Sequence, residues 1–287
     1  RVIDTRSVAA TFSFAWHPDH DTLAYGYYGP AGSGTRGAGA VFTVSPSGEA
    51  KNVGCSAATD VLAWLPDGSL VARDDDHLYV VSPTDCATRT AVDAERLRAA
   101  AYAPTGTHLA YFRRKLTYEK DVHEYTPDTS LILSNERGQA RESLFGADRR
   151  PRHLQWSPDG NELAFTVHVD ATDRRQISIY NVNTERTVYL TPPSKTAADQ
   201  IHPRWSPSAS HVAFTRENGS QSVAAVRMDG HTRRLAPVEG AVWGWVDDRT
   251  LVVPGPDSLR ITSLDGRTQH TQPTPSTVVH VWRMPPA

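Results

Sequence analysis

The hydrophobic pattern of this chain consists of short apolar runs separated by polar turns, and the unit recurs six times. In the clearest copy, Trp156 closes one apolar run, Pro-Asp-Gly follows at 158–160, and Leu-Ala-Phe at 163–165 begins the next. Proline presets φ for the first corner of a tight turn, and glycine accepts the positive φ that follows. The unit therefore predicts two antiparallel strands joined by a turn.

The spacing of the repeat predicts its size. Its aromatic residues are Trp16, Trp64, Tyr102, Trp156, Trp205 and Trp245, so that neighbouring copies lie 38 to 54 residues apart. This is the size of a four-stranded propeller blade rather than of a helical repeat. The sixth copy lacks the Pro-Asp-Gly turn.

Each repeat also contains a third, apolar run and a fourth, more polar run. In the fourth repeat these runs lie at 176–182 and 186–190. The other third strands are expected at 39–44, 77–81, 130–133, 222–226 and 258–261. No stretch of helical length keeps an apolar period of 3.6 residues, so the sequence predicts an all-β protein.

The repeat resembles the TolB-like propeller repeat, a relative of WD40-like (PD40) repeats, over about residues 7–270. The resemblance implies one six-bladed β-propeller domain over 1–287, made of four-stranded antiparallel blades. The expected blades are 7–55, 56–94, 95–147, 148–195, 196–238 and 239–287. A ring must be closed, and we expect a terminal strand at 1–6 or 278–282 to complete the last blade.

The same resemblance says little about function. Proteins with this repeat include periplasmic scaffolds, ectodomains of bacterial lipoproteins and sensors, propeller caps of serine peptidases, and some lyases. It implies an extracytoplasmic bacterial protein. The chain begins at Arg1 rather than Met, so we expect it to be trimmed, and a leader or an anchor could precede it.

The composition narrows the possible partners. The formal net charge of −2 gives no general attraction to nucleic acid. No apolar run reaches the roughly 18–20 residues of a membrane helix, so we expect no membrane insertion by this segment. We expect a monomer.

The two cysteines, Cys55 and Cys86, leave two alternatives open. A disulfide between them would close a loop of about 32 residues and stabilise the fold by roughly 3–4 kcal/mol. However, the expected strands place the two cysteines on opposite faces of the ring. This placement favours two unpaired thiols.

Several sequence motifs argue against a class of enzyme or ligand site rather than for one. The Gly-x-Gly-x-x-Gly sequence at 32–37 lies between two strands without a helix, so it is expected to be a hairpin loop. The chain contains no Gly-x-Ser-x-Gly sequence, which excludes a complete α/β serine peptidase. No histidine has zinc-protease or zinc-finger spacing, so neither a metal nor a cofactor is expected. The turn histidines His17, His20, His108 and His211 are expected to be solvated.

Long connections indicate a binding face. Two long loops are expected at 26–39 and 113–129, and a third connection at 168–175, all on the side of the connections between blades. Insertions that gather on one face of a repeat ring usually mark its binding face. The candidate binding residues are Tyr27, Tyr28, Arg113, Tyr118, His123, Tyr125 and His168. They suit a protein, peptide or glycan partner without catalysis; solvated loops with no ligand are the alternative.

Two other functions remain open. A lyase or cyclase could act in the central pore, with His202 and His153 as acid and base and Arg150 as a carboxylate clamp. The starts of the first strands would then surround the pore mouth with Arg96, Arg150, Gln200 and His202. The third possibility is an assembly scaffold, which would expose an apolar patch on the blade rims.

Two basic groups, at 113–115 and 149–152, could bind phosphate, carboxylate or a polyanionic glycan. The acidic residues Glu119, Asp121, Glu124 and Asp148 lie close to them in the sequence. Ordinary ion pairing at the surface is therefore the favoured interpretation of both groups.

Overall fold

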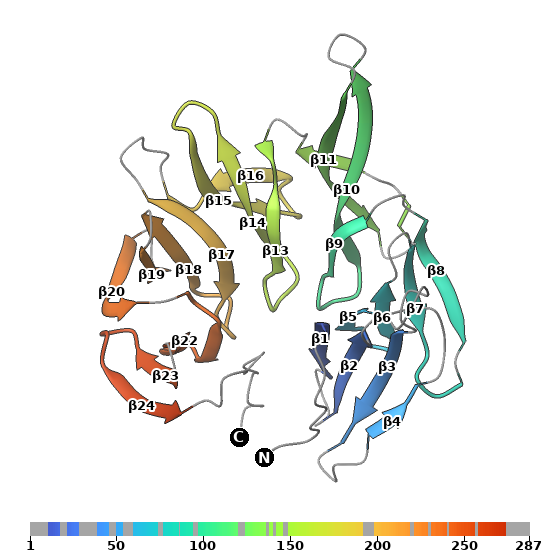
Figure 1. Ribbon diagram of the computed structural model, residues 1–287, viewed down its shortest axis with the longest axis horizontal. Helices are drawn as coiled ribbons and strands as arrows, with labels where there is room; N and C mark the ends of the chain where they lie inside the picture. Colours follow the sequence, from blue (N-terminus) through green and yellow to red (C-terminus); the bar gives the residue numbers. More distant parts are fainter. Residues whose placement is uncertain are drawn as a thin grey trace. The chain divides into compact units, whose positions relative to one another are not determined.

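The computed structural model describes residues 11–17, 22–28, 39–45, 50–53, 60–73, 77–85, 87–93, 97–119, 124–135, 138–139, 142–145, 149–191, 198–218, 221–228, 231–239, 241–255 and 258–273. Within these ranges every element with assigned bounds is a β-strand, from β1 to β24 (Figure 1). The all-β prediction is confirmed. A search of the described residues found no helix long and apolar enough to cross a membrane.

The chain divides into two compact units, Arg1–Leu144 and Phe145–Ala287. In both units, each successive group of four strands forms one sheet in chain order. The six predicted four-stranded sheets are therefore present. The closed ring and the blade boundaries stay predictions. The described residues do not include either terminal segment, 1–6 or 278–282, or either cysteine, Cys55 or Cys86. Both alternatives for the cysteines therefore stay predictions.

The first unit contains three sheets. The first comprises β1 (Thr11–Trp16), β2 (Leu23–Tyr28), β3 (Gly39–Val44) and β4 (Ala50–Asn52). The second comprises β5 (Asp60–Trp64), β6 (Leu70–Arg73), β7 (His77–Val81) and β8 (Thr88–Asp93). The third comprises β9 (Leu97–Tyr102), β10 (His108–Glu119), β11 (Glu124–Asn135) and β12 (Glu142–Phe145). The strands expected at 39–44 and 77–81 coincide with β3 and β7.

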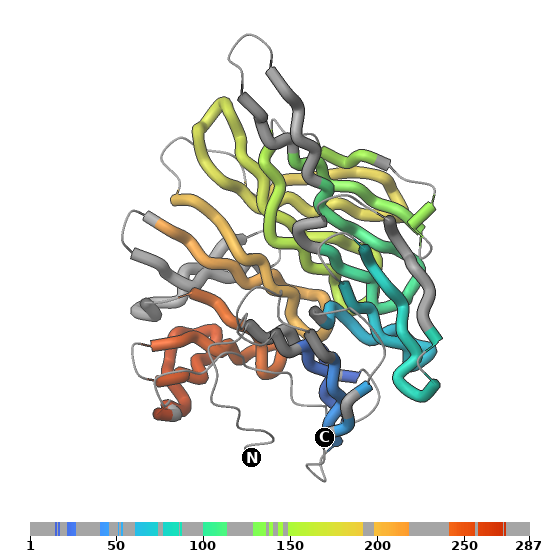
Figure 2. Tube along the Cα trace, turned by 45° about the vertical axis from the view of Figure 1, so that its right-hand side comes forward, coloured from blue at the N-terminus to red at the C-terminus, as the bar shows by residue number. Residues whose placement is uncertain are grey.

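The second unit repeats this arrangement, and the tube in Figure 2 follows its strands through each sheet. Its first sheet comprises β13 (Arg152–Trp156), β14 (Glu162–Val169), β15 (Arg174–Asn181) and β16 (Arg186–Tyr189). The next comprises β17 (Asp199–Trp205), β18 (Val212–Asn218), β19 (Gln221–Met228) and β20 (His231–Glu239). The last comprises β21 (Gly244–Asp247), β22 (Thr250–Pro254), β23 (Ser258–Ser263) and β24 (Thr268–Pro273). The sixth repeat thus forms a complete sheet without a Pro-Asp-Gly turn.

The turn of the repeat is held by a serine at its start. The Ser157 backbone N–H donates to the Glu162 carbonyl oxygen at 2.8 Å, and the Gly160 N–H donates to the Ser157 carbonyl oxygen at 2.9 Å. The Ser157 hydroxyl accepts from the Glu162 N–H at 2.9 Å and donates to Asp159 Oδ1 at 2.5 Å. Gly160 has φ 72°, the left-handed conformation that the sequence predicts for this corner.

The aromatic residue of the repeat joins consecutive sheets. Trp64 Nε1 donates to the Ala15 carbonyl oxygen at 3.0 Å, and Trp245 Nε1 donates to that of Arg204 at 2.9 Å. Ala15 and Arg204 each directly precede the aromatic residue of the preceding sheet. The indoles of Trp64 and Trp245 therefore fill the space between two sheets and also donate to the backbone of the neighbouring sheet.

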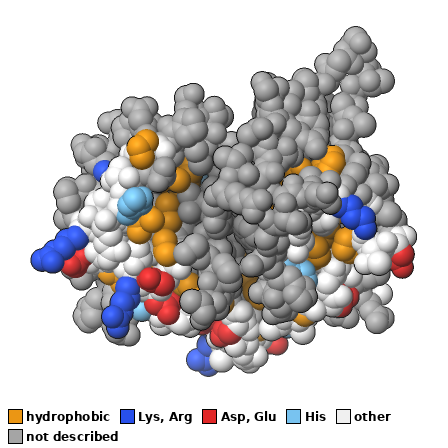
Figure 3. All heavy atoms as spheres, turned by 90° about the horizontal axis from the view of Figure 1, so that it is seen from below, with side chains coloured by type: hydrophobic (Ala, Val, Ile, Leu, Met, Phe, Trp, Pro, Cys, Tyr) orange, Lys and Arg blue, Asp and Glu red, His pale blue; other side chains and the backbone are white. Residues whose placement is uncertain are grey.

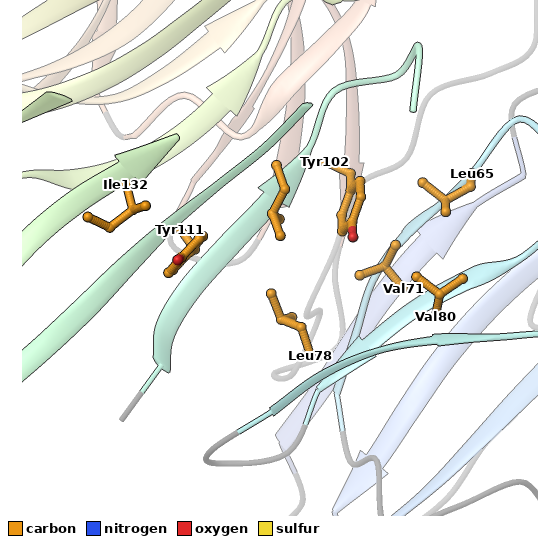
Figure 4. Close-up of a cluster of buried hydrophobic side chains, with 8 residues drawn as sticks. Leu65, Val71, Leu78, Val80, Tyr102, Tyr111 and Ile132 are labelled. Atoms are coloured by element: carbon orange, nitrogen blue, oxygen red, sulfur yellow. The ribbon is translucent and has the colours of Figure 1, made fainter. Parts of the chain in front are cut away.

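Apolar clusters fill the spaces between sheets. In the first unit, Val71, Leu78 and Val80 of the second sheet pack with Tyr102, Leu109, Tyr111 and Ile132 of the third, together with Leu65 (Figure 4). In the second unit, Ile177 and Ile179 pack against Trp205, Val212 and Phe214 of the following sheet. The middle strands are consequently apolar on both faces, as expected for sheets stacked against one another.

Candidate functional site

Two histidines from consecutive sheets of the second unit meet side by side. His153 lies in β13 and His202 in β17, each three positions before the aromatic residue of its repeat. Their ring centroids are 4.0 Å apart, with 57° between the ring planes. The repeat gives them equivalent positions in the sequence, and the packing of β13 beside β17 brings the rings together.

Both histidines have an unusual backbone conformation. His153 has φ 56° and His202 has φ 53°, a region that residues other than glycine rarely adopt. Each lies at an irregularity in strand pairing, between Arg152 and Gln155 in one sheet and between Ile201 and Arg204 in the next. A left-handed residue of this kind costs on the order of 1–2 kcal/mol, and such strain concentrates at functional sites. The pair is therefore our candidate site.

The surroundings keep His153 neutral. Its ring is partly buried, and its Nδ1 lies 3.3 Å from the hydroxyl oxygen of Thr166, which is fully buried. Burial lowers the pKa of His153 to about 4, and the neighbouring His202 and arginines act in the same direction. At neutral pH this imidazole is unprotonated, with one nitrogen that can accept a proton or a hydrogen bond.

His202 is shifted in the same direction. Burial lowers its pKa first, the charge of Arg204 lowers it further, and Glu217 opposes the shift. The pair therefore presents two uncharged rings at neutral pH. Uncharged imidazoles can donate and accept hydrogen bonds, exchange protons or bind metals.

Arg204 follows His202 by two residues and its charge acts on both histidines, but it was not among the residues predicted from the sequence. It is partly buried; its Nε donates to the Trp243 carbonyl oxygen at 3.2 Å, and its Nη1 to that of Pro203 at 3.1 Å. Burial lowers its pKa. Both acceptors are uncharged, and no carboxylate among the described residues pairs with it. Its position two residues after His202 and directly before the repeat tryptophan was the available signal.

A three-residue ion network lies at the same end of β17. Arg175 donates from its backbone N–H and from Nε to the two carboxylate oxygens of Asp199, each at 2.9 Å. Its Nη2 reaches Glu217 Oε2 at 3.1 Å. These contacts tie the β14–β15 hairpin to the start of β17 and to the end of β18.

Two other predicted residues of this unit, Arg150 of the pore alternative and His168 of the binding face, lie apart from the histidine pair. Arg150 is exposed with φ 41°, and no contact between it and either histidine is described. His168 lies in β14 with its Nε2 3.5 Å from Oδ1 of both Asp170 and Asp173. Arg204 therefore takes the place beside the pair that the sequence analysis gave to Arg150.

The expected exposure of Gln200 is wrong. Gln200 is 4% exposed, and its Nε2 donates to the Thr191 hydroxyl at 2.5 Å. That hydroxyl donates in turn to Oε1 of the fully buried Gln176 at 3.3 Å. Gln200 therefore belongs to the interior between two sheets rather than to a solvent-facing mouth, and Arg96 lies outside the described residues.

Three turn histidines are also less solvated than expected. His17, His108 and His211 are all partly buried. The ring of His17 lies 4.8 Å from that of Trp64, and the ring of His211 lies 6.0 Å from that of Trp245. These two rings thus pack on the aromatic residue of the following sheet. His20 lies outside the described residues.

The segment expected to form a long loop at 113–129 is mostly a hairpin. β10 and β11 pair from His108↔Asn135 to Glu119↔Glu124, which includes Tyr118↔Tyr125, whereas β9 pairs with β10 only as far as Leu97↔Arg113. The loop was predicted because its polar residues and Pro127 hide the strand pattern. Arg113 is exposed.

The structure does not test the other predicted binding residues of the first unit. Tyr27 and Tyr28 end β2 opposite Ala40 and Gly39. Their side chains, like those of Tyr118 and Tyr125, lie outside the described part of the structure, as does His123 altogether. Their binding role stays a prediction.

The described surface mixes both signs of charge. On the face drawn in Figure 3, described basic and acidic side chains lie beside one another. A search of the described residues for three or more histidine, cysteine, aspartate or glutamate side chains able to hold a metal found no such group.

Known proteins resemble this chain in structure but not in sequence. No protein-family model matches it, and no curated protein sequence matches it. TolB from Acinetobacter baumannii superposes with a TM-score of 0.60 at 17% identity, over 88% of this chain and 64% of that one. An oligogalacturonate lyase from Vibrio parahaemolyticus gives 0.71 at 12% identity, over 94% and 80%. A puromycin-hydrolyzing peptidase from Mycobacterium tuberculosis gives 0.62 at 15% identity, over 88% and 44%.

These likenesses are to proteins of the β-propeller fold. This chain spans less than two thirds of the length of that TolB and less than half of that of the peptidase. At identities of 12 to 17% the comparison speaks for the fold alone.

Proposed function

We propose that this chain is a non-catalytic propeller that binds a ligand or a protein, with the His153–His202 pair at the centre of a ligand site in the second unit. The observation that carries the proposal is the contact of two left-handed histidines from consecutive sheets at 4.0 Å. Two independent sheets place the same strained residue at the same point. Packing alone does not require an imidazole there, because Val242 occupies the equivalent position of the sixth repeat.

The surroundings support binding at this end of the second unit. Arg175, Asp199 and Glu217 hold the β14–β15 hairpin against β17 and β18. This network fixes the strand that carries His202 before any ligand arrives. Preorganisation of this kind lowers the entropic cost of binding.

The test is a thermal-shift screen with a defined set of monosaccharides, uronic acids, amino acids and dipeptides, followed by calorimetry of each hit. Variants His153→Ala and His202→Ala should each weaken binding of a true ligand at least tenfold. His211→Ala, which alters a partly buried histidine elsewhere in the same unit, is the matched control. Hits that bind all three variants equally would place the ligand site elsewhere.

Proton-transfer chemistry is the second candidate, and one observation favours it. His153 is neutral at physiological pH, as a general base must be, and it lies against a second imidazole. Each confirmed ligand should be incubated with the protein and its products followed by mass spectrometry. Turnover that disappears in His153→Gln while binding persists would replace the binding proposal with an enzyme.

In the first unit, we propose that the β10–β11 hairpin contacts a protein, a peptide or a glycan. The β10–β11 pair continues beyond its neighbour β9, and two-stranded ribbons are only marginally stable alone. Alanine at Tyr118, His123 and Tyr125 together should abolish binding of any protein partner identified with the intact chain. Unchanged partner binding would show that the wrong surface was chosen.

The proposal includes an extracytoplasmic location, in a bacterial lipoprotein or sensor. The structural likeness to TolB supports this context only through the fold. Cell fractionation of the source organism with an antibody to this chain would test it, and recovery in the cytoplasmic fraction would contradict it.

A further inference from the structure

Arg204 has a positive charge without a described counter-ion. The guanidinium is partly withdrawn from water, and among the described residues it donates hydrogen bonds only to the carbonyl oxygens of Trp243 and Pro203. Desolvation is the sole cause of its lowered pKa. Cations removed from water are normally paired with an anion, since carbonyl dipoles replace only part of the lost hydration.

The nearby carboxylates are already engaged. Asp199 and Glu217 both bind Arg175, at 2.9 Å and 3.1 Å. Glu217 influences His202 only at a distance, and there it opposes the effect of Arg204. Arg152, the first residue of β13, lies near enough to His153 to lower its pKa, and no carboxylate partner for it is described either. Positive charge around the histidines is therefore left uncompensated.

The two imidazoles complete a set of hydrogen-bond donors. His153 and His202 lie in contact, and the charge of Arg204 acts on both rings. A neutral imidazole donates one hydrogen bond, and a protonated one donates two. A planar guanidinium suits the two oxygens of a carboxylate or of a phosphate.

We propose that the group anchored here is an oxyanion, a carboxylate or phosphate of the ligand, which takes hydrogen bonds from His153 and His202 and serves as the counter-ion of Arg204. This inference rests on the proposed ligand site and names the chemical class that the site accepts. It also changes the interpretation of one residue in the basic group at 149–152. Ordinary ion pairing at the surface was the favoured interpretation for Arg152, which we now place at the rim of the anion site.

Binding of an oxyanion should be coupled to proton uptake. The groups facing the pair are Thr166, Arg152, Arg175, Arg204 and Glu217; burial first, and then the charges of the arginines, hold both imidazoles in the uncharged form. A bound anion reverses that field and raises the pKa of both rings. Affinity for the anion therefore rises as pH falls from neutrality towards the pKa of the unliganded pair.

The experiment is NMR titration of the histidine ring resonances with sodium acetate and with inorganic phosphate, at pH 5.5 and 7.5 and at constant ionic strength set by sodium chloride. His153→Gln, His202→Gln and His211→Gln assign the signals. We expect saturable shifts of the His153 and His202 signals, at least fivefold tighter at pH 5.5, with little change at His211. The stronger probe distinguishes a carboxylate site from a phosphate site.

Two further variants keep a positive charge at the altered position, so that a loss of anion binding does not have to come from a loss of folding. Arg204→Lys retains the charge and should weaken saturation by several-fold, while Arg186→Lys, which alters an exposed arginine of β16, should leave it unchanged. Shifts that are absent, that grow linearly with anion concentration, or that are equal at His211 would overturn the oxyanion assignment. If neutral ligands from the thermal-shift screen still move His153 and His202, the ligand site stands and only its chemical class is wrong.

Discussion

At the scale of single residues, the burial of His153 makes the stability of the fold depend on pH. In the folded chain its pKa is about 4, below the ordinary value of 6.5, so the unfolded chain binds more protons between these values. The contribution of this group to the unfolding free energy is therefore fully present above pH 6.5, and it is lost as the pH falls from 6.5 to about 4. Urea unfolding should show a loss of about 2 kcal/mol between pH 7 and pH 4.5 from this group.

The control for this effect is His153→Gln, which cannot be protonated. This variant should lose stability less steeply than the parent chain over the same pH range, while His211→Gln should follow the parent. Parallel curves for the parent chain and His153→Gln would show that the ring is solvated in the folded protein.

Two glycines of the first unit allow the free-energy cost of backbone strain to be measured apart from the cost of a steric contact. Gly68 has φ 80° and Gly106 has φ 74°, and they occupy the same corner of consecutive repeats. An added Cβ at Gly68 would meet open space, whereas at Gly106 it would lie 3.1 Å from Cδ of Pro66. Gly68→Ala should cost about 1 kcal/mol from φ alone, and Gly106→Ala should cost more. Equal losses in chemical unfolding would mean that Pro66 yields without cost.

At the scale of elements, the repeat tryptophans allow a matched test of how sheets are joined. Trp245 Nε1 donates to the Arg204 carbonyl oxygen, whereas the buried Trp205 Nε1 has no partner among the described residues, although both side chains are buried. Trp245→Phe should therefore destabilise the fold by about 1 kcal/mol more than Trp205→Phe, because it alone leaves a carbonyl without its donor. Equal unfolding free energies for the two variants would mean that the indole stabilises only by its volume.

The strand elements were predictable to different degrees. The strands at 39–44 and 77–81 were predicted to the residue, because turn residues bound an apolar run on both sides. The β10–β11 hairpin was not, because Pro127 and charged residues interrupt the apolar alternation beyond Arg113. Its register comes instead from the backbone ladder that continues from the buried half of the same strands.

At the scale of the whole molecule, the predicted ring closure can be tested by truncation. Either residues 1–6 or residues 278–282 are expected to complete the last blade, and a strand formed there would carry its own ladder of hydrogen bonds. Deletion of the closing segment should lower the thermal midpoint by several degrees, and deletion of the other should leave it nearly unchanged. Two neutral deletions would contradict closure by either terminus.

The sequence by itself determined the repeat, the four-stranded sheets and the turn chemistry, because these depend on contacts between residues close in the chain. It also named His153 and His202. Only the tertiary structure decided that the two rings touch, that Gln200 is interior, and that Arg204 rather than Arg150 lies beside the pair. These facts depend on how one sheet packs on the next and on where each strand pairing shifts register, and neither follows from the spacing of a repeat.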